Sequence, residues 1–481
     1  MARFSSSHRS LTAAVCLVLL LCGFVYHQKA DQSTFISVSG SKGTSKNTPI
    51  GDCSVDLEYL RSLGFNHSVD YARWNIRVTE SKKFTEFSES LDVPVPEFNR
   101  LELDTEAAID TLPAGQCPRA VKIEAPKRKA PVDASHLMFG VATTIDRLDD
   151  SLGAIARWAG GTKARVIALV ESDASLNITQ VMQHAKELDV TLQILENDEE
   201  FLDRYYRLTR IIYELRDEST QWAIIIDDDT FFPNMEGLVA QLATYDETKP
   251  YYIGAPTENM QQMASFTYMG YGGAGVFLSM PLLQEIDAHF DECFEYKDHG
   301  DKRVSKCIYR YTSTKLTWDR HLFQLDLSPD GSGFYEAGRQ LPLSVHHWKS
   351  PDWFPVNIVG MSQVADICGR DCQLQRWRIT DDWYFINGFS LVRYSEPQAP
   401  EDLASMEQTW SYFSWTEDDS YEYSLGPLRP RDNGKLSYRL LDAVSTNKQV
   451  RQIYLRQTDE WYYDDEEPEN PQLLEVVWTL A

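Results

Sequence analysis

The feature that most constrains this 481-residue chain is an apolar run that ends in three consecutive carboxylates. Residues 222–226 (Trp-Ala-Ile-Ile-Ile) are followed at once by Asp227, Asp228 and Asp229. Such a short β-branched run predicts a buried central strand, and open α/β sheets bind ligands beyond the carboxyl ends of their strands. Three adjacent carboxylates repel one another unless a cation neutralises them. The run therefore predicts a divalent-metal site with hard oxygen ligands at a sheet edge.

Several other interpretations of the acid cluster compete with this one. A solvated turn is common for clustered acids, but the preceding isoleucines argue against a surface loop. A haloacid-dehalogenase phosphatase has a small Thr or Val two residues past the second Asp, where this chain has Phe231. Prenyl synthases place D-D-x-x-D on a helix, and no helical periodicity precedes Asp227. The remaining interpretation is the D-x-D element of a nucleotide-sugar glycosyltransferase, in which a metal bridges carboxylate and diphosphate.

The N-terminal region predicts a membrane anchor. Residues 10–28 contain no Lys, Arg, Asp or Glu and have a strongly apolar centre. As a helix they would span about 28 Å, close to the thickness of a bilayer core. Arg3 and Arg9 precede them, which favours a cytoplasmic tail at residues 1–9 and a lumenal remainder. Residues 29–51 are expected to form a flexible stem. A cleaved signal peptide is the alternative, although no A-x-A site follows the apolar core.

Charge and sequons indicate the compartment and exclude one class of partner. The chain has 46 Lys and Arg against 72 Asp and Glu, a formal charge of −26. Nucleic-acid binding requires basic patches, so no nucleic-acid partner is expected. Asn66 and Asn177 begin N-glycosylation sequons, which fit a secretory route.

Six cysteines follow the predicted anchor, and an even number in a lumenal chain allows three disulfides. Fifteen pairings are possible. The spacing of Cys368 and Cys372 is also compatible with zinc, but no second ligand pair accompanies them. Proximity in sequence favours Cys293–Cys307, Cys368–Cys372 and, by remainder, Cys53–Cys117.

Beyond the stem the chain divides into three parts that differ in sequence pattern. Residues 52–130 are weakly patterned and end in a Pro- and Lys-containing linker. Within residues 131–376, expected strands (137–144, 165–170, 190–195, 222–226) alternate with expected helices (148–158, 181–188, 201–214), which predicts a mostly parallel α/β sheet. Residues 377–481 alternate short aromatic or β-branched runs with turns, which predicts a C-terminal all-β domain. The chain has no Walker A or G-x-G-x-x-G loop, which disfavours a P-loop or dinucleotide enzyme.

Further candidate residues follow the acid cluster. The glycine-rich loop at residues 270–275 predicts close approach of backbone to another group. His346 and His347 stand in strand-like sequence, and adjacent strand residues point to opposite faces, so at most one of them is expected to be a ligand. Trp318, Asp319 and Trp348 could contact an acceptor sugar.

These segments, in this order, resemble the Fringe-like branch of glycosyltransferase family 31, particularly its fungal members, over about residues 135–348. The motifs that carry the resemblance are Asp227-Asp228-Asp229, Gly272-Gly273-Ala274-Gly275, Gly300-Asp301 before Cys307, and His346-His347-Trp348-Lys349-Ser350.

The resemblance implies a GT-A fold, a UDP-sugar donor, Mn²⁺ and an inverting transfer to a glycan or glycoprotein acceptor, commonly with a β1,3 linkage. It implies a single-pass type II protein of the Golgi membrane. By residue, it makes Asp229 the metal-binding carboxylate, assisted by Asp227 and His346, and Asp301 the catalytic base. The nucleotide-contacting positions would be Thr143, Thr144, Arg147 and Asp228, and the loop at the donor and acceptor would be Gly272, Gly273, Ala274 and Gly275.

The sequence departs from the family pattern at one position, which limits how far the roles of family residues can be carried over. Fringe proteins proper carry two acids at the base position, whereas Gly300 precedes Asp301 here, so Fringe's own donor and acceptor do not carry over. Asp319 is the rival base, although Arg320 beside it favours a structural ion pair. A lumenal glycan-binding protein without turnover and a secreted hydrolase with a Ca²⁺-binding acid cluster are the other function classes.

Overall fold

The computed structural model describes residues 51, 53–82, 90–91, 93–113, 116–117, 119–172, 177–338, 340–411, 424–446, 448–457 and 468–481. The expected cytoplasmic tail (1–9), the expected anchor (10–28) and all but the last residue of the expected stem (29–51) lie outside these ranges. Within them, no helix combines the length and the apolar character needed to cross a bilayer.

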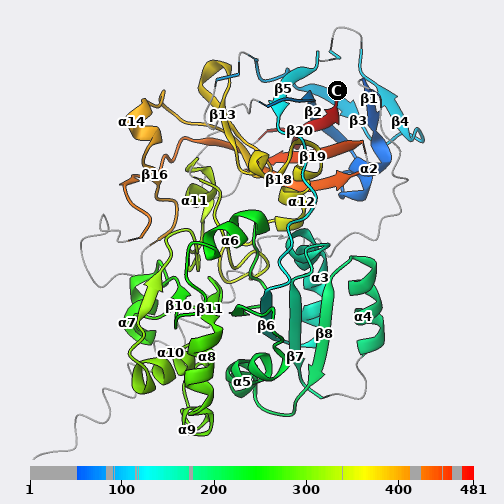
Figure 1. Ribbon diagram of the computed structural model, residues 1–481. Coiled ribbons are helices and arrows are strands. Elements are labelled where there is room, and N and C mark those ends of the chain that lie inside the picture. The colour runs from blue at the N-terminus through cyan, green and yellow to red at the C-terminus, as the bar shows by residue number, and fades with distance from the viewer. Residues whose placement is uncertain are drawn as a thin grey trace, which may run out of the picture. The chain divides into compact units, whose positions relative to one another are not determined.

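A seven-stranded sheet forms the centre of the α/β part (Figure 1). Its order is β12-β10-β11-β9-β6-β7-β8. Every neighbouring pair is parallel except the two that involve β11, so the expectation of a mostly parallel sheet is confirmed. The strands are β6 (Leu137–Ala142), β7 (Arg165–Val170), β8 (Thr191–Glu196), β9 (Trp222–Ile226), β10 (Tyr252–Gly254), β11 (Val276–Ser279) and β12 (Leu316–Trp318).

Helices cover both faces of this sheet, which explains the unbroken apolar run of β9. Trp222, Ile224 and Ile226 belong to the core on the α3 face, whereas Ala223 and Ile225 belong to the core on the face of α5, α8 and α10. A strand buried on both faces cannot alternate apolar with polar residues. The helices of this part are α3 (Ile145–Ala159), α4 (Ile178–Glu187), α5 (Phe201–Leu215), α6 (Met235–Leu242), α7 (Met260–Phe266), α8 (Met280–Asp287), α9 (Phe290–Phe294) and α10 (Gly300–Tyr311).

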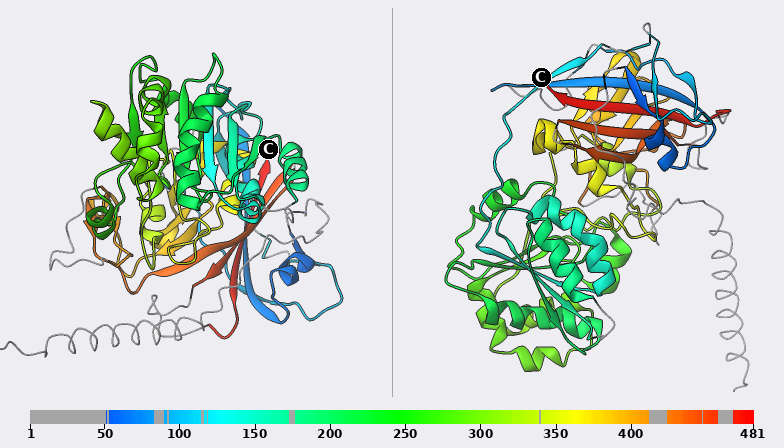
Figure 2. Two further views of the ribbon diagram at one scale, coloured as in Figure 1. Left: turned by 90° about the horizontal axis from the view of Figure 1, so that it is seen from below. Right: turned by 90° about the vertical axis from the view of Figure 1, so that its right-hand side faces the viewer.

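A second sheet of nine strands corrects the predicted division of the chain (Figure 2). Residues 52–130 and 377–481 were expected to be separate parts, but β2 pairs in parallel with β20, so both contribute to one sheet. Residues 121–125 of the expected linker form β5, which pairs with β2. The strands are β2 (Ser68–Glu80), β3 (Asn99–Glu102), β5 (Val121–Ala125), β13 (Arg376–Arg378), β14 (Trp383–Ile386), β15 (Ser390–Arg393), β18 (Leu436–Ser445), β19 (Gln449–Arg456) and β20 (Gln472–Leu480).

Short elements connect and border the two sheets. They are β1 (Ser54–Asp56), α2 (Leu57–Ser62), β4 (Ile109–Thr111), α11 (Ser332–Glu336), α12 (Ile358–Ser362), α13 (Ala365–Cys368), η2 (Arg370–Cys372), η3 (Thr380–Asp382), α14 (Pro400–Leu403), β16 (Met406–Glu407) and β17 (Leu428–Arg429).

Three disulfides follow the proximity pairing expected from the sequence. They join Cys53 to Cys117, Cys293 to Cys307, and Cys368 to Cys372. The Cys368–Cys372 bond removes the zinc alternative for that pair. Both sequon asparagines are exposed, and Asn177 caps α4.

Candidate active site

The turn after β9 presents the three carboxylates in different environments. The Asp227 side chain is 35% exposed, whereas Asp228 and Asp229 are buried. The backbone of this turn is fixed to a neighbouring segment because Phe231 and Val345 exchange hydrogen bonds of 2.8 and 2.9 Å. The same bridge brings the histidine pair that follows Val345 to the carboxyl end of β9.

Asp228 is neutralised by the protein itself. Arg147 donates from both Nε, at 2.6 Å, and Nη2 to its carboxylate, and Thr143 donates its hydroxyl to the same group. The ammonium of Lys349 lies 3.4 Å from Asp228 Oδ1. Thr144 instead caps α3, because its hydroxyl accepts from the Arg147 amide at 3.2 Å. The predicted nucleotide-contacting residues are thus gathered at the start of α3, with Asp228 holding Arg147 in place.

Asp229 forms a compact cluster with both histidines. His346 Nε2 lies 2.9 Å from Asp229 Oδ1, and His347 Nδ1 lies 3.9 Å from Asp229 Oδ2. One ligand atom from each of the three residues falls within 4.8 Å of the others, which is suitable for one metal ion. Asp227 is adjacent, with Oδ2 3.4 Å from His346 Nε2, but it is not a member of this trio.

The expectation that only one histidine could face the cluster is wrong, and the backbone gives the reason. His347 has φ = 62°, in the left-handed region, so the alternation of an extended strand ends at this residue. The two imidazole rings consequently lie on the same side, with centroids 3.7 Å apart. Trp353 stacks on the other side of the His347 ring at 4.8 Å.

Hydrogen bonds orient each imidazole toward Asp229. His346 Nδ1 lies 3.0 Å from the Gln324 carbonyl, which leaves Nε2 for the cluster. His347 Nε2 lies 2.8 Å from Asp326 Oδ1, which leaves Nδ1 for the cluster. That Nδ1 atom is buried and has no hydrogen-bond partner. An orphaned, buried nitrogen beside a carboxylate fits a metal ligand, because a carboxylate partner on the opposite ring nitrogen is the usual arrangement for a metal-binding histidine.

The clustered carboxylates favour positive charge at this site. Burial lowers the pKa of His346, but the carboxylates of Asp229 and Asp227 outweigh this effect and raise the pKa to about 9. Burial alone would raise the pKa of Asp229, but His346, His347 and Ser350 hold it well below its ordinary value. Burial and the neighbouring carboxylates raise the pKa of Asp227 to about 7. A proton on His346 thus occupies the electrostatic position that a cation would take.

The glycine-rich loop is required by the packing around this cluster. A Cβ on Gly273 would lie 2.1 Å from His346 Nδ1. A Cβ on Gly272 would lie 2.5 Å from the Tyr205 hydroxyl and 2.9 Å from Asp227 Oδ1. Gly275 has φ = 93°, and the Ala274 amide donates to Gln324 Oε1 at 3.0 Å. The loop therefore approaches protein side chains of the site closely.

Asp301 lies outside the trio, on the first turn of α10. Its carboxylate accepts from the amides of Gly272, at 3.2 Å, and Lys302, at 2.7 Å. Burial raises the pKa of Asp301, although these amides partly oppose the change. The side chain remains partly accessible. The carboxylate is thus held beside the glycine-rich loop and outside the Asp229–His346–His347 trio.

Asp319, the rival base, is buried and has structural partners. Gln241 donates to it at 2.7 Å, and both the amide and Nδ1 of His321 lie 3.0 Å from Oδ1. Arg320 does not pair with it but stacks over Trp318 at 4.1 Å. Trp348 packs against the core on the α3 face.

Three residues of the site were not predicted from the sequence. Ser350 donates its hydroxyl to Asp229, Asp326 holds His347, and the buried Tyr205 hydroxyl lies beside Gly272 without a hydrogen-bond partner. Ser350 belongs to a motif that carries the resemblance, so its place in that motif was a usable signal. Asp326 and Tyr205 lie in unremarkable sequence, and no local pattern distinguishes them.

Comparisons with known proteins give two family matches and a distant relative. Residues 173–326 match the family model described as Fringe-like, and residues 261–472 match one described as "Protein of unknown function, DUF604". Chondroitin sulfate synthase 3 from mouse and from human are each 26% identical over 113 residues, which is 22% of this chain. The aligned segment spans only 13% of those relatives' length.

Solved glycosyltransferases are similar only at a low level. The glycosyltransferase GlyE of Streptococcus pneumoniae has a TM-score of 0.31 and 14% identity, over 45% of this chain and 55% of that one. Mouse xyloside xylosyltransferase 1 also has a TM-score of 0.31, with 10% identity over 46% and 99% of the two chains. These scores are too low to support an argument, so the family match carries the assignment. The chain contains a glycosyltransferase domain. Within it, residues 173–326 match the Fringe-like family model, in agreement with the resemblance found from the motifs.

Proposed function

We propose that this protein transfers a sugar from a UDP-sugar to a glycan acceptor with inversion at the anomeric carbon, forming a β1,3 linkage. The observation that carries the proposal is the convergence of Asp229, His346 and His347 at the carboxyl end of β9, with Asp301 close by but outside the trio. The Fringe-like match over residues 173–326 supports the reaction class.

The donor set fits a divalent transition metal, for which we propose Mn²⁺. One carboxylate oxygen and two imidazole nitrogens disfavour Ca²⁺, which takes oxygen ligands, and so disfavour the Ca²⁺-binding hydrolase. When bound, the ion would neutralise charge on the leaving diphosphate. Asp229, His346 and His347 would hold it, and Arg147 and Lys349 add further positive charge at the same edge.

Asp301 is the proposed base for the acceptor hydroxyl. A base must be free of the metal, accessible to substrate and able to take a proton. Asp301 satisfies the first two conditions, and burial raises its pKa, which strengthens it as a proton acceptor. The hydrogen bonds from Gly272 and Lys302 fix the carboxylate in one orientation.

A screen of UDP-sugars by thermal shift in Mn²⁺ tests this proposal, because a tight ligand raises the unfolding temperature by mass action. A glycan-binding protein without turnover would bind glycan without Mn²⁺-dependent loss of UDP-sugar. The proposed setting is the Golgi lumen, with residues 10–28 as a type II anchor and glycans on Asn66 and Asn177. Protease protection in sealed microsomes and glycosidase sensitivity test this topology.

A further inference from the structure

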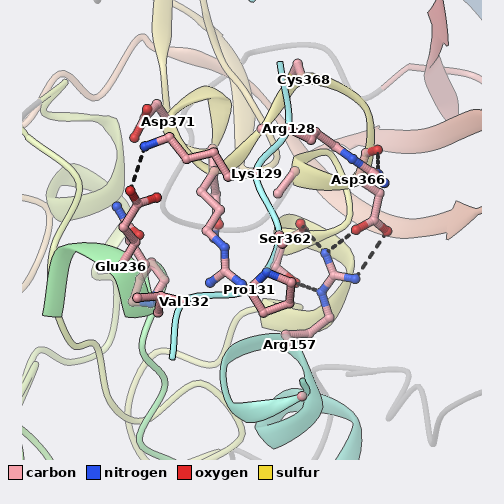
Figure 3. Close-up of a pocket in the computed structure, with 18 of the residues that line it drawn as sticks. Arg128, Lys129, Pro131, Val132, Arg157, Glu236, Ser362, Asp366, Cys368 and Asp371 are labelled. Atoms are coloured by element: carbon pink, nitrogen blue, oxygen red, sulfur yellow. Dashed lines mark hydrogen bonds and ion pairs between the residues drawn. The ribbon is translucent and has the colours of Figure 1, made fainter. Parts of the chain in front are cut away.

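A cationic cavity lies apart from the Asp229 cluster, between the linker at residues 126–132, the end of α3 and the segment at residues 362–373 (Figure 3). Its volume is about 340 Å³, within the range of small-molecule sites. Five cationic residues (Lys127, Arg128, Lys129, Arg157 and Arg370) and three acidic ones line it, although the whole chain has a formal charge of −26.

Two of the five cations are paired with carboxylates of the cavity. Arg157 donates to Asp366 from Nη1 at 3.2 Å and Nη2 at 3.0 Å, and also bonds Ser362. Lys129 pairs with Glu236 at 2.6 Å. Figure 3 shows the Arg157 pair on one side of the cavity and the Lys129 pair on the other. Of the remaining cations, Lys127 and Arg128 are exposed, and Arg128 donates to the backbone carbonyl of Asp366.

Arg370 is different. Among the described residues, no hydrogen bond or ion pair reaches its guanidinium group, although the side chain is partly buried and lines the cavity. Burial and the nearby Arg157 lower the pKa of Arg370, although the carboxylates of Glu236 and Asp366 partly oppose the change. Burial thus disfavours the charge of this guanidinium group. An incoming anion would compensate that cost, and a guanidinium group binds planar and tetrahedral oxyanions through two parallel hydrogen bonds.

The local covalent structure holds Arg370 in this position. It lies in the three-residue loop closed by the Cys368–Cys372 disulfide, directly after Gly369 with φ = 84°. A loop this short restricts the backbone position of its central residue. The disulfide therefore preorganises the arginine, which reduces the entropy lost on binding.

We propose that this cavity binds an oxyanion (a carboxylate, phosphate or sulfate group) with Arg370 as its principal ligand. The volume exceeds the need of the anion alone and leaves room for an attached sugar ring. The site is independent of the proposed transfer reaction, since none of its residues belongs to the Asp229 cluster.

Thermal shift and calorimetry on the full chain, with chelator present and ionic strength constant, test this proposal. The probes are inorganic phosphate, glucuronate and glucose 6-phosphate, with glucose as the neutral control. We expect the anions to raise the unfolding temperature of the wild type and of Arg310→Gln, a control at an exposed arginine of α10, but not of Arg370→Gln. If all three anions raise the unfolding temperature, the site binds a free oxyanion. If only glucuronate and glucose 6-phosphate raise it, the site binds an oxyanion attached to a sugar.

Two results would overturn the proposal. One is the absence of an anion response that depends on Arg370, whether the variant and the wild type respond equally or neither responds. The other concerns stability without anion. Because no hydrogen bond or ion pair from the described residues reaches Arg370, and burial and Arg157 disfavour its charge, Arg370→Gln should unfold at the same temperature as the wild type or higher. A clear decrease would make Arg370 a structural residue instead.

Discussion

His347 Nε2 lies 2.8 Å from Asp326 Oδ1, and this contact determines which nitrogen of His347 faces Asp229. Asp326 is itself fixed by the Gln324 amide group at 3.2 Å and by the Thr257 hydroxyl. The cluster at Asp229 therefore depends on a residue that does not belong to it. Orientation of this kind commonly changes metal affinity by 10- to 100-fold.

Asp326→Asn should weaken Mn²⁺ binding by about 10- to 100-fold, because the amide holds the His347 ring less firmly. Calorimetric titration with Mn²⁺ alone measures this. Asp319→Asn is the matched control, since that buried carboxylate has partners outside the cluster. Equal loss of affinity in the two variants would show a general effect on folding.

Both histidines should contribute to metal binding. His346→Gln and His347→Gln are each expected to reduce Mn²⁺ affinity by more than about tenfold, since each removes one of three ligands. If His347→Gln bound Mn²⁺ with wild-type affinity, only His346 would be a histidine ligand of the metal.

Metal binding should release a proton near neutral pH. The raised pKa of His346, about 9, means that it is protonated at pH 7.5, and a cation can bind Nε2 only after that proton leaves. Calorimetry in two buffers of different ionisation enthalpy should show about one proton released per metal ion in the wild type and fewer in His346→Gln. Equal proton release in both proteins would contradict the assignment.

With chelator present, the raised pKa of His346 should make the protein less stable as pH rises. A group whose pKa is raised by folding contributes its stability fully below its unfolded pKa of about 6.5 and loses it as pH passes the folded value of about 9. Asp227, whose pKa is raised from 3.8 to about 7, acts in the same direction, but mostly below pH 7. The unfolding temperature should therefore decrease between about pH 6.5 and 9. A constant or rising value over this window would mean that His346 is not charged.

Gly273→Ala should displace His346, because the added Cβ would lie 2.1 Å from Nδ1. We expect a loss of stability of about 1–3 kcal/mol and strongly reduced Mn²⁺ binding. Gly153→Ala in α3 is the control, since its Cβ would meet nothing within 4 Å and alanine favours a helix. Urea unfolding and Mn²⁺ titration of both variants measure the two effects.

The parts of the structure that depend on local pattern were predictable. The strands at 165–170 and 222–226 have the expected bounds, because periodicity and β-branched residues report burial directly. The pairing of β2 with β20 was not predictable, since it joins segments from opposite ends of the chain. Likewise, Asp229 and His346 of the candidate metal trio were expected from motifs, whereas Asp227, expected with them, lies outside the trio. The place of His347 depends on one φ angle and on Asp326. A single sequence carries no local signal for either.

The central claim is that Asp229 would hold the metal ion that neutralises the leaving diphosphate, and that Asp301 takes the proton of the acceptor hydroxyl. Release of UDP from UDP-sugars, with acceptor glycans and Mn²⁺ present, tests it most directly in wild type, Asp229→Ala and Asp301→Asn. The account predicts Mn²⁺-dependent release in the wild type and none in Asp229→Ala. In Asp301→Asn, kcat should fall by about a hundredfold or more while UDP affinity stays near normal, because only proton transfer is lost. Full activity in Asp229→Ala, or near-normal kcat in Asp301→Asn with inactive but folded Asp319→Asn, would contradict it.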